Sequence, residues 1–280
     1  MDTQKVWFVT GASKGLGLSL VKKLIQEGYK VAATSRKLED LTREMGEASD
    51  VFLPLQVDLV NEQSVANAIA DTMSKWGRIE VVVNNAGYGQ LGTLEELSDA
   101  EARQNFDVNV FGSLNVIRLV MPHFRAQLSG NIFNISSIGG FTGNFPGWGI
   151  YCATKFAVAG FTESLSAEAK AFGITATVVY PGYFRTSFLS KESLNTPINE
   201  IAAYKEAREV QALHENQIGG NQPGDPDKAA AVLIDVVKNG TPPLHLFLGQ
   251  DAYELAKSKL VTIQKDLAAH ETLATATNFN

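Results

Sequence analysis

The chain has 280 residues but only one cysteine, Cys152, so no disulfide bond can form within it. No apolar run approaches the roughly 20 residues that a membrane-spanning helix requires. The first residues contain no basic segment followed by an apolar stretch and a small-residue cleavage site, so we expect no signal peptide. These absences predict a soluble protein with no membrane span, and the cytoplasm is its expected compartment.

Positive charge is also scarce. Lysine and arginine number 24 against 30 aspartate and glutamate residues, which gives a formal net charge of −6. A protein that binds the nucleic-acid backbone needs a basic face, so we expect no nucleic-acid partner. A small anionic ligand held by a few local cations is compatible with this balance.

The motifs of two other site classes are missing as well. None of the four histidines lies in an HxxxH pattern or in a cluster with cysteine, so we predict no metal site. No GxSxG segment marks the nucleophile of a hydrolase.

Short runs of β-branched and aromatic residues alternate with longer segments of helical spacing, which are clearest at Leu16–Glu27, Glu62–Trp76 and Tyr151–Phe172. Strands that are apolar on both faces and separated by helices indicate a parallel sheet covered on both sides. The fold class predicted is α/β: a single-domain Rossmann fold over residues 1–280, a doubly wound parallel sheet of about seven strands with helices on both faces. The predicted strands are Lys5–Thr10, Lys30–Thr34, Val51–Leu55, Glu80–Asn84, Asn131–Ile135, Thr175–Tyr180 and Leu244–Leu248.

Two regions depart from this alternation. Ser187–Pro226 is polar and punctuated by glycine and proline, so we interpret it as a substrate-binding loop with one or two short helices, one of them over Ile198–Glu215. Its position suggests a lid over the substrate. After the last strand, Asp251–His270 is predicted to form a C-terminal helix, and we expect the tail Glu271–Asn280 to fray.

A glycine-rich turn follows the first predicted strand. A dinucleotide needs a tight turn that leads into a helix N-terminus, so that the backbone approaches the pyrophosphate. An ordinary strand–helix loop can also contain glycines, but the position after the first strand of an alternating chain favours a cofactor site. The turn reads Thr10-Gly11-Ala12-Ser13-Lys14-Gly15-Leu16-Gly17.

The choice of cofactor is expected at the end of the second strand, where the residues are Ser35 and Arg36. An acidic residue there would bind the ribose 2′-hydroxyl of NAD(H) and repel the 2′-phosphate of NADP(H). A guanidinium instead suits a phosphate, and Lys14 is a second cation for it. Each of these cations alone could be an ordinary solvated charge, but together they favour NADP(H).

Tyr151 and Lys155 are four residues apart in a predicted helix and therefore share a face. A nearby ammonium favours phenolate and should lower the tyrosine pKa toward the range useful for acid–base catalysis. Such a pair is often only surface. Here, however, Ser136 and Ser137 follow a predicted strand at the edge where open α/β sheets bind ligands, and one of them can hydrogen-bond a substrate oxygen. The other is expected to be a turn residue.

At this point the sequence resembles the short-chain dehydrogenase/reductase family, over about Lys5 to Gly249. The glycine-rich turn matches the family's TGxxxGxG. Each further motif also follows its expected strand: Asn84-Asn85-Ala86-Gly87 matches NNAG, Tyr151 to Lys155 matches YxxxK, and Pro181-Gly182 matches PG.

The resemblance implies a catalytic set of Asn109, Ser137, Tyr151 and Lys155. Tyr151 would exchange a proton with the substrate oxygen, Lys155 would lower its pKa and hold the nicotinamide ribose, Ser137 would orient the oxygen, and Asn109 would complete a proton relay. The cofactor-binding residues implied or derived are Gly11, Ser13, Lys14, Gly15, Leu16, Gly17, Ser35, Arg36, Asp58, Leu59, Asn85, Ala86, Gly87, Tyr151, Lys155, Pro181, Gly182 and Thr186. Among these, Asp58 would contact the adenine and Thr186 the nicotinamide carboxamide.

One spacing departs from the family pattern. Ser137 lies one residue farther from Tyr151 than in many members, and the usual spacing would point to Ile138, which has no hydroxyl. We interpret this as an extra residue in the loop Gly143–Gly149 and keep Ser137, with Ser136 as the alternative.

The predicted function is NADPH-dependent interconversion of a ketone or aldehyde and an alcohol. The alternatives are a non-catalytic NADP(H)-sensing protein and an epimerase or dehydratase on the same scaffold. The small-molecule substrate is expected to be apolar, because aromatic residues gather after the PG motif and before Tyr151, although these could equally be core or oligomer contacts. They are Tyr183, Phe184, Phe188 and Leu189, and Phe145, Pro146 and Trp148. Relatives commonly associate through the helices that hold Asn109 and Tyr151, so a homodimer or homotetramer is expected.

Overall fold

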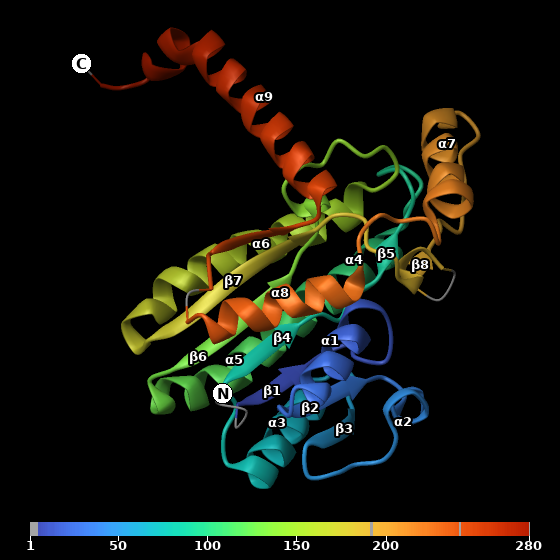
Figure 1. Ribbon diagram of the computed structural model, residues 1–280. Coiled ribbons are helices and arrows are strands. Elements are labelled where there is room, and N and C mark those ends of the chain that lie inside the picture. The colour runs from blue at the N-terminus through green and yellow to red at the C-terminus, as the bar shows by residue number, and fades with distance from the viewer. Residues whose placement is uncertain (1–4, 191–192, 241, 280) are drawn as a thin grey trace.

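The computed structural model describes residues 5–190, 193–240 and 242–279 and contains one central parallel sheet. The strands are ordered β3-β2-β1-β4-β6-β7-β9, and every neighbouring pair is parallel (Figure 1). The predicted Rossmann-type fold and its seven strands are therefore confirmed, with each boundary within one residue of its predicted place. The strands are β1 (Val6–Val9), β2 (Lys30–Ser35), β3 (Phe52–Gln56), β4 (Val81–Asn84), β6 (Gly130–Ile135), β7 (Ile174–Pro181) and β9 (His245–Leu248).

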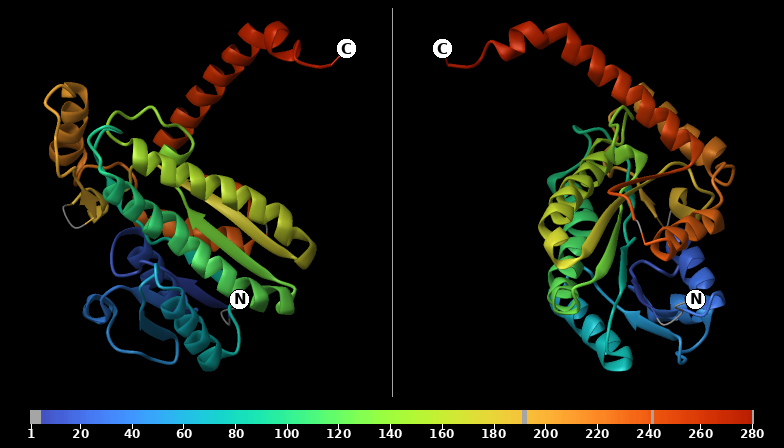
Figure 2. Two further views of the ribbon diagram at one scale, coloured as in Figure 1. Left: turned by 180° about the vertical axis from the view of Figure 1, so that it is seen from behind. Right: turned by 60° about the vertical axis from the view of Figure 1, so that its left-hand side comes forward.

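Helices cover both faces of this sheet (Figure 2). On one face lie α3 (Glu62–Trp76), α5 (Gly112–Gln127) and α6 (Gly149–Ala169), and on the other lie α1 (Gly15–Gln26) and α8 (Pro226–Lys238). Successive strand residues point to opposite faces, so the two layers share the apolar strands between them. The first layer buries Phe8, Ile69, Val120, Phe124, Ile132 and Leu165, and the second buries Trp7, Val9, Leu20, Leu24, Phe133 and Ile234.

The strand order reverses at the centre of the sheet. From β1 the chain adds β2 and β3 on one side, and then crosses to add the remaining strands on the other. This reversal leaves a crevice at the carboxyl ends of β1 and β4, which is where open α/β sheets bind ligands. The glycine-rich turn follows β1 and the Asn84–Gly87 turn follows β4, so both predicted cofactor motifs meet at this crevice.

The predicted substrate-binding loop lies above the crevice and is described except for Lys191 and Glu192. Within it, β8 (Leu194–Asn195) pairs in parallel with β5 (Gly89–Gln90), a short strand that follows the Asn84–Gly87 turn. The loop is therefore tied by backbone hydrogen bonds to the segment that leaves β4.

The helix predicted in this loop is shorter than expected. Helix α7 spans Lys205–Leu213 and continues as a π-helical turn over His214–Ile218, so the predicted start at Ile198 is wrong. The physical reason is that the backbone N–H groups of Ile198 and Ile201 donate to carboxylates of another segment rather than to a helix of their own.

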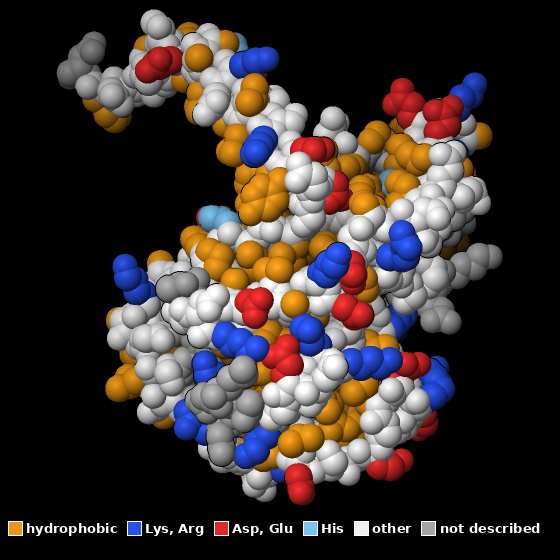
Figure 3. Space-filling model, viewed as in Figure 1, with side chains coloured by type: hydrophobic (Ala, Val, Ile, Leu, Met, Phe, Trp, Pro, Cys, Tyr) orange, Lys and Arg blue, Asp and Glu red, His pale blue; other side chains and the backbone are white. Residues whose placement is uncertain are grey.

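The C-terminal helix α9 spans Gln250–Thr275 and passes the predicted end at His270. The expectation that residues 271–280 fray is wrong for their first half, because this alanine-rich sequence favours helix; Asn280 lies outside the described residues. Beyond its first turns α9 projects away from the domain, and apolar side chains such as Leu267 are exposed along it (Figure 3).

Candidate functional site

A cavity of about 1150 Å³ opens at the carboxyl ends of the strands. Most of the predicted site residues line it; Gly17 and Asn109 are the exceptions. The predicted residues on its wall are Gly11, Ser13, Lys14, Gly15, Leu16, Ser35, Arg36, Asp58, Leu59, Asn85, Ala86, Gly87, Ser136, Ser137, Tyr151, Lys155, Pro181, Gly182 and Thr186. The fold therefore brings residues from most of the chain's length to one place.

The glycine-rich turn has the geometry of a dinucleotide cradle. Gly11 and Gly15 adopt positive φ angles of 63° and 58°, which favour glycine. A Cβ at Gly11 would lie 2.7 Å from the Cα of Ala86, so the two turns touch. Helix α1 begins at Gly15 without a side-chain cap, which leaves its first N–H groups for an anion. This chain therefore fits a nicotinamide dinucleotide.

Gly17 and Asn85 lie where the glycine-rich turn and helix α1 pack against the Asn84–Gly87 turn. The Asn85 Nδ2 donates to the carbonyl oxygens of Thr10 and Gly11, both at 3.0 Å. A Cβ at Gly17 would lie 2.5 Å from that same Nδ2. The third glycine of the motif thus permits close packing of α1 against the Asn84–Gly87 turn, as such glycines do.

The end of β2 presents a cation and a hydroxyl group to the cavity. The buried Ser35 Oγ donates to Ser13 Oγ at 3.1 Å, which joins β2 to the glycine-rich turn. The exposed Arg36 lies close enough to Tyr88 to favour its phenolate, although burial is the larger influence and raises the pKa of Tyr88. No salt bridge engages the Arg36 guanidinium among the described residues.

Acidic side chains also reach this rim, but they are already paired. Asp40 accepts from Arg43 at 2.8 Å, and Glu44 lies 3.2 Å from the ammonium of Lys22. The carboxylates of Asp40 and Glu44 are therefore neutralised locally.

Tyr151 and Lys155 lie on the first turns of α6 and are both buried, as the four-residue spacing predicts. The Lys155 Nζ donates to the carbonyl oxygen of Ile135 at 2.9 Å and lies 5.7 Å from the centre of the Tyr151 ring. The Tyr151 hydroxyl is hydrogen-bonded to the side chain of Ser137. The geometry thus brings a hydroxyl, an ammonium and a second hydroxyl together at the end of β6.

The pKa of Tyr151 does not shift as the sequence led us to expect. Burial raises it above the usual value of a phenol, and the hydrogen bond with Ser137 opposes this effect. Burial also lowers the pKa of Lys155 to about 8, because the ammonium has little solvent around it. The expected lowering of the tyrosine pKa by Lys155 is therefore wrong.

The two serines after β6 have different partners. Ser136 is fully engaged in the core, where its Oγ donates to the carbonyl oxygen of Lys155 at 2.7 Å. Ser137 accepts from the N–H of Gly139 at 3.0 Å and meets Tyr151 on the cavity wall. The geometry favours Ser137 for a role toward substrate and Ser136 for a role in positioning the helix.

Asn109 lies in a π-helical turn over Asp107–Phe111, and this turn directs its side chain inward. Its Oδ1 accepts from the N–H of Tyr88 at 3.0 Å, and its Nδ2 donates to the carbonyl of Tyr88 and to Thr154 Oγ1. A Cβ at Gly87 would lie 3.0 Å from Asn109 Oδ1 and 3.4 Å from Lys155 Nζ. Asn109 and Lys155 thus flank the same backbone position, although no direct hydrogen bond joins them.

The cavity also has walls that the motifs did not identify. His214 and Gln222 reach it from the substrate-binding loop, and Cys152 and Tyr88 reach it from the body of the domain. Cys152 occupies a variable position of the YxxxK motif and the other three belong to no motif, so only the folded chain could reveal them. Of the aromatic clusters considered earlier, all members except Pro146 line the cavity.

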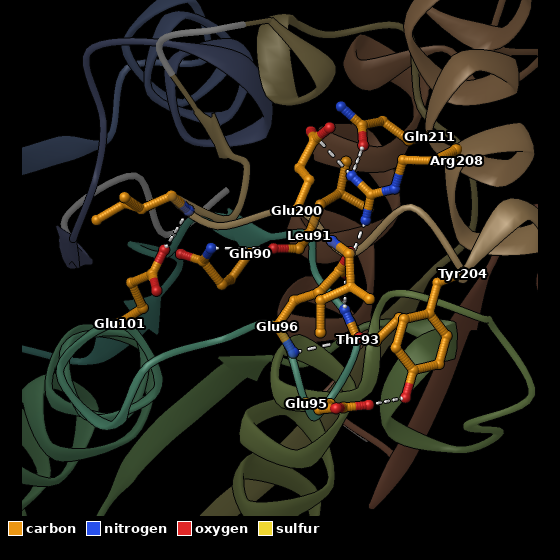
Figure 4. A network of polar contacts seen from close by, with 12 residues as sticks. Gln90, Leu91, Thr93, Glu95, Glu96, Glu101, Glu200, Tyr204, Arg208 and Gln211 are labelled. Atoms are coloured by element: carbon orange, nitrogen blue, oxygen red, sulfur yellow. Dashed lines mark hydrogen bonds and ion pairs between the residues drawn. The ribbon is translucent and has the colours of Figure 1, made fainter.

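A buried carboxylate anchors the substrate-binding loop beside the cavity (Figure 4). Glu96 accepts hydrogen bonds from the N–H groups of Thr93 and Ile201, both at 2.8 Å, and from the Arg208 guanidinium at 2.8 Å. Arg208 also pairs with Glu200 at 3.0 Å. Burial opposes ionisation of Glu96, but these donors outweigh it and hold its pKa below the usual value.

The described residues contain neither a membrane-spanning helix nor a cluster of metal ligands. No helix there is long and apolar enough to cross a membrane. No group of three or more His, Cys, Asp or Glu side chains is arranged there to hold a metal ion.

Comparison with known proteins adds relatives of similar length. The family model described as short chain dehydrogenase matches residues 5–196. Oxidoreductase BOA17 of Botryotinia fuckeliana is 34% identical over 253 residues, which cover 90% of this chain and 91% of that protein. The 3-ketodihydrosphingosine reductase of Bacteroides thetaiotaomicron is 34% identical over 258 residues, covering 91% of this chain and 92% of that protein.

Solved structures share the fold as well. A short-chain dehydrogenase from Streptomyces avermitilis superposes with a TM-score of 0.89 at 34% identity, covering 98% of this chain and 100% of the other. A short-chain dehydrogenase from Burkholderia cenocepacia in complex with NADP has a TM-score of 0.73 at 25% identity, covering 96% and 98%. A 3-ketoacyl-(acyl-carrier-protein) reductase from Brucella melitensis, complexed with NADH, has a TM-score of 0.73 at 24% identity, covering 88% and 98%.

Proposed function

The chain belongs to the short-chain dehydrogenase family and is an oxidoreductase that uses a nicotinamide cofactor; on that premise we propose that it reduces a ketone or aldehyde with NADPH. The observation that carries the proposal is the hydroxyl of Tyr151, buried beside Ser137 and Lys155 on the same cavity as an uncapped helix N-terminus. A non-catalytic sensor would leave this proton-donating group without its simplest use.

The bound cofactor would supply the hydride. Tyr151 would donate its proton to the carbonyl oxygen, and Ser137 would hold that oxygen in place through its own hydroxyl. Burial favours the protonated form of Tyr151, which is the form that reduction needs. Lys155 would bind the ribose hydroxyls once its Nζ turns from the carbonyl of Ile135, and Asn109 would fix the backbone of Tyr88 beside it.

The preference for NADP(H) is supported by the rim at the end of β2. Arg36 is exposed there, Ser35 and Ser13 supply hydroxyls, and Lys14 lies at the start of α1. We assign the 2′-phosphate to this group because charged donors bind phosphate strongly. Asp58 and Leu59, which line the cavity after β3, would contact the adenine, and Thr186 would contact the carboxamide.

The proposal is tested by measuring NADPH oxidation with ketones and aldehydes of graded size, against NADH with the same compounds. We expect turnover of at least one apolar carbonyl compound with NADPH. Absence of turnover with both cofactors, in a protein that still binds NADPH, would count against a reductase and favour the sensor.

The substrate-binding loop is proposed to act as a lid, and Glu96 as its anchor. Glu96→Gln removes the charge that faces Arg208 and puts an amide NH₂ where a carboxylate oxygen accepted, so at least one donor loses its partner. Losing a buried partner costs about 1–3 kcal/mol. We expect amide exchange in residues 197–208 to rise about tenfold or more and the KM for the carbonyl substrate to rise with it, because about 1.4 kcal/mol is tenfold.

Glu95→Gln is the matched control for this anchor. Among the described residues, Glu95 accepts only from the hydroxyl of Tyr204, at the exposed side of the same network. The variant Glu95→Gln should leave amide exchange in the lid close to that of the wild type, since exposed pairs contribute little to stability. Equal exchange in Glu96→Gln and wild type would contradict the anchor. The Glu96 carboxylate has a lowered pKa, so its contribution is complete above about pH 4.5 and is lost as the pH falls further.

We also propose a homodimer or homotetramer formed through the helices that hold Asn109 and Tyr151. Phe111 and Phe156 are exposed on these helices and would be buried in such an interface. Helix α9 leaves the domain elsewhere and does not cover this face (Figure 2). Sedimentation that shows only a species of 30.3 kDa would contradict the assembly.

A further inference from the structure

The end of the cavity near Tyr151 is aromatic and uncharged. We define this substrate end by its lining residues Phe145, Trp148, Cys152, Tyr183, Phe188, Leu189 and His214. Apart from Lys155, the charged side chains that line the cavity belong to the segments that follow β1, β2 and β3. A buried charge without a partner is costly. The described residues therefore favour a neutral substrate at this end.

One pair of polar side chains interrupts the aromatic wall. The hydroxyl of Tyr183, directly after the Pro181-Gly182 motif, lies 3.0 Å from Nε2 of His214 on the substrate-binding loop. Tyr183 is held in place by its own N–H, which donates to the Asp251 carboxylate at 2.6 Å. His214 is buried, and its ring lies 5.0 Å from that of Trp148.

The direction of this hydrogen bond follows from the other ring nitrogen. The His214 Nδ1 lies 2.7 Å from the carbonyl oxygen of Val210, which can only accept, so Nδ1 carries the hydrogen. In the neutral ring Nε2 must then accept, and Tyr183 must donate. Burial lowers the pKa of His214 and so favours this neutral ring. The lone pairs of the Tyr183 oxygen consequently stay available as acceptors toward the cavity.

The pair lies close to the reacting group. The centre of the Trp148 ring lies 5.4 Å from that of Tyr151 and 5.0 Å from that of His214. The ring centres of Tyr183 and His214 are 5.8 Å apart. Tyr183 is also near enough to Tyr151 that the charge of one phenolate would raise the pKa of Tyr151. A small substrate with its carbonyl at Tyr151 would therefore extend along this arc of rings to Tyr183.

We propose that Tyr183 and His214 form a second recognition site, which selects neutral ketones or aldehydes that carry a hydroxyl group. The O–H of that group donates to the Tyr183 oxygen while the carbonyl oxygen meets Tyr151. A hydroxyl fits better than an amine, because an amine would be charged here without a carboxylate to pair with. The buried amide oxygen of Gln222 and the buried indole N–H of Trp148, both in residues of the cavity wall, have no hydrogen-bond partner within the described residues. The inference rests on the carbonyl reduction proposed above.

The test compares ketones that differ in one group. Acetophenone and 4-phenyl-2-butanone are each measured with a hydroxyl at the ortho, meta or para position and with the corresponding methyl ether. For each enzyme the readout is the ratio of kcat/KM for the substituted ketone to that of its parent. In the wild type, at least one hydroxyl isomer should exceed its parent about five- to tenfold, which corresponds to one net hydrogen bond of ~1 kcal/mol. Its methyl ether, which cannot donate, should show no such gain.

Two variants separate this site from general effects on the loop. In Tyr183→Phe the hydroxyl ratio should fall to about 1, whatever the rate with the parent ketone, because the acceptor is gone but the ring is kept. Tyr204→Phe removes a phenol hydroxyl outside the cavity, where Tyr204 donates to Glu95, and should keep the wild-type ratio. Equal ratios in wild type and Tyr183→Phe would overturn the recognition site even if every ketone is reduced.

A binding measurement decides the case in which no ketone is reduced. Phenol and anisole are compared by saturation-transfer NMR on the NADP⁺ complex of the wild type and of Tyr183→Phe. We expect phenol to bind more tightly than anisole in the wild type alone. The same phenol signal in both proteins would overturn the site independently of turnover, whereas absent turnover with a Tyr183-dependent phenol signal would count against the reductase alone.

Discussion

Tyr151→Phe should lower kcat by about 10²–10⁴-fold while NADPH still binds, because the change removes one proton-donating hydroxyl and keeps the ring. The loss should appear in kcat and in kcat/KM alike, as expected for a group that acts in the transition state. The ring contacts of Tyr151 with Trp148 and Phe188 do not involve the hydroxyl, so the wall of the cavity should keep its shape. Turnover with NADPH and binding of NADPH by titration calorimetry are the two measurements.

Ser136→Ala and Ser137→Ala give this experiment its internal comparison. Ser137→Ala removes the hydrogen-bond partner of Tyr151 and should also reduce kcat, but by less than Tyr151→Phe does. Ser136→Ala removes a donor to the carbonyl of Lys155 and should act mainly on thermal stability. Retention of most of the wild-type kcat by Tyr151→Phe would remove Tyr151 from the role of proton donor.

The fold could be predicted because its signals are local. Each strand is a short apolar run, and the four-residue spacing of Tyr151 and Lys155 places both on one face once α6 forms. The limits of α3 were equally readable, since Asn61 caps this helix and Gly77 ends it in a left-handed conformation. Signals of this kind depend on a few neighbouring residues.

Features that depend on contacts distant in sequence were not predictable. Ile198 and Ile201 look helical, yet carboxylates from the segment after β5 take their N–H groups. Asn109 is buried within a π-helical turn, and no pattern of hydrophobic residues indicates such a turn. The Tyr183–His214 pair joins two segments through the folded loop, and nothing in either segment identifies its partner.

The direction of the Tyr151 pKa shift was wrong for a related reason. The sequence shows that a lysine lies one turn away, but it does not show how deeply both side chains are buried. Burial disfavours phenolate and ammonium alike, and here it raises the pKa of Tyr151 and lowers that of Lys155. Charge pairing can be estimated from spacing, whereas desolvation requires the surrounding side chains.

The double change Ser35→Asp with Arg36→Ala should reverse the cofactor preference from NADPH to NADH. It removes the cation that we assign to the 2′-phosphate and adds a carboxylate that repels it. The new Asp would stand beside Ser13, whose hydroxyl now accepts from Ser35 and could instead donate to the carboxylate. That carboxylate could accept from the free ribose 2′-hydroxyl of NADH.

The expected size of this reversal follows from the contacts involved. A charge-assisted hydrogen bond contributes about 1.5–3 kcal/mol, and about 1.4 kcal/mol is tenfold. Arg36→Ala alone should therefore reduce the NADPH preference by roughly one to two decades, and the added carboxylate should carry the double variant past equality. The measurement is kcat/KM for both cofactors with one ketone.

Arg118→Ala is the matched control, because this guanidinium pairs with Glu62 on the α3–α5 face and does not line the cavity. Its loss changes the net charge as Arg36→Ala does, so it should leave the ratio of NADPH to NADH efficiency at the wild-type value. A wild type that already prefers NADH would contradict the assignment most directly. Arg36 and Lys14 would then be solvated surface charges, and the glycine-rich turn would bind the pyrophosphate that both cofactors share, since its backbone geometry does not depend on either cation.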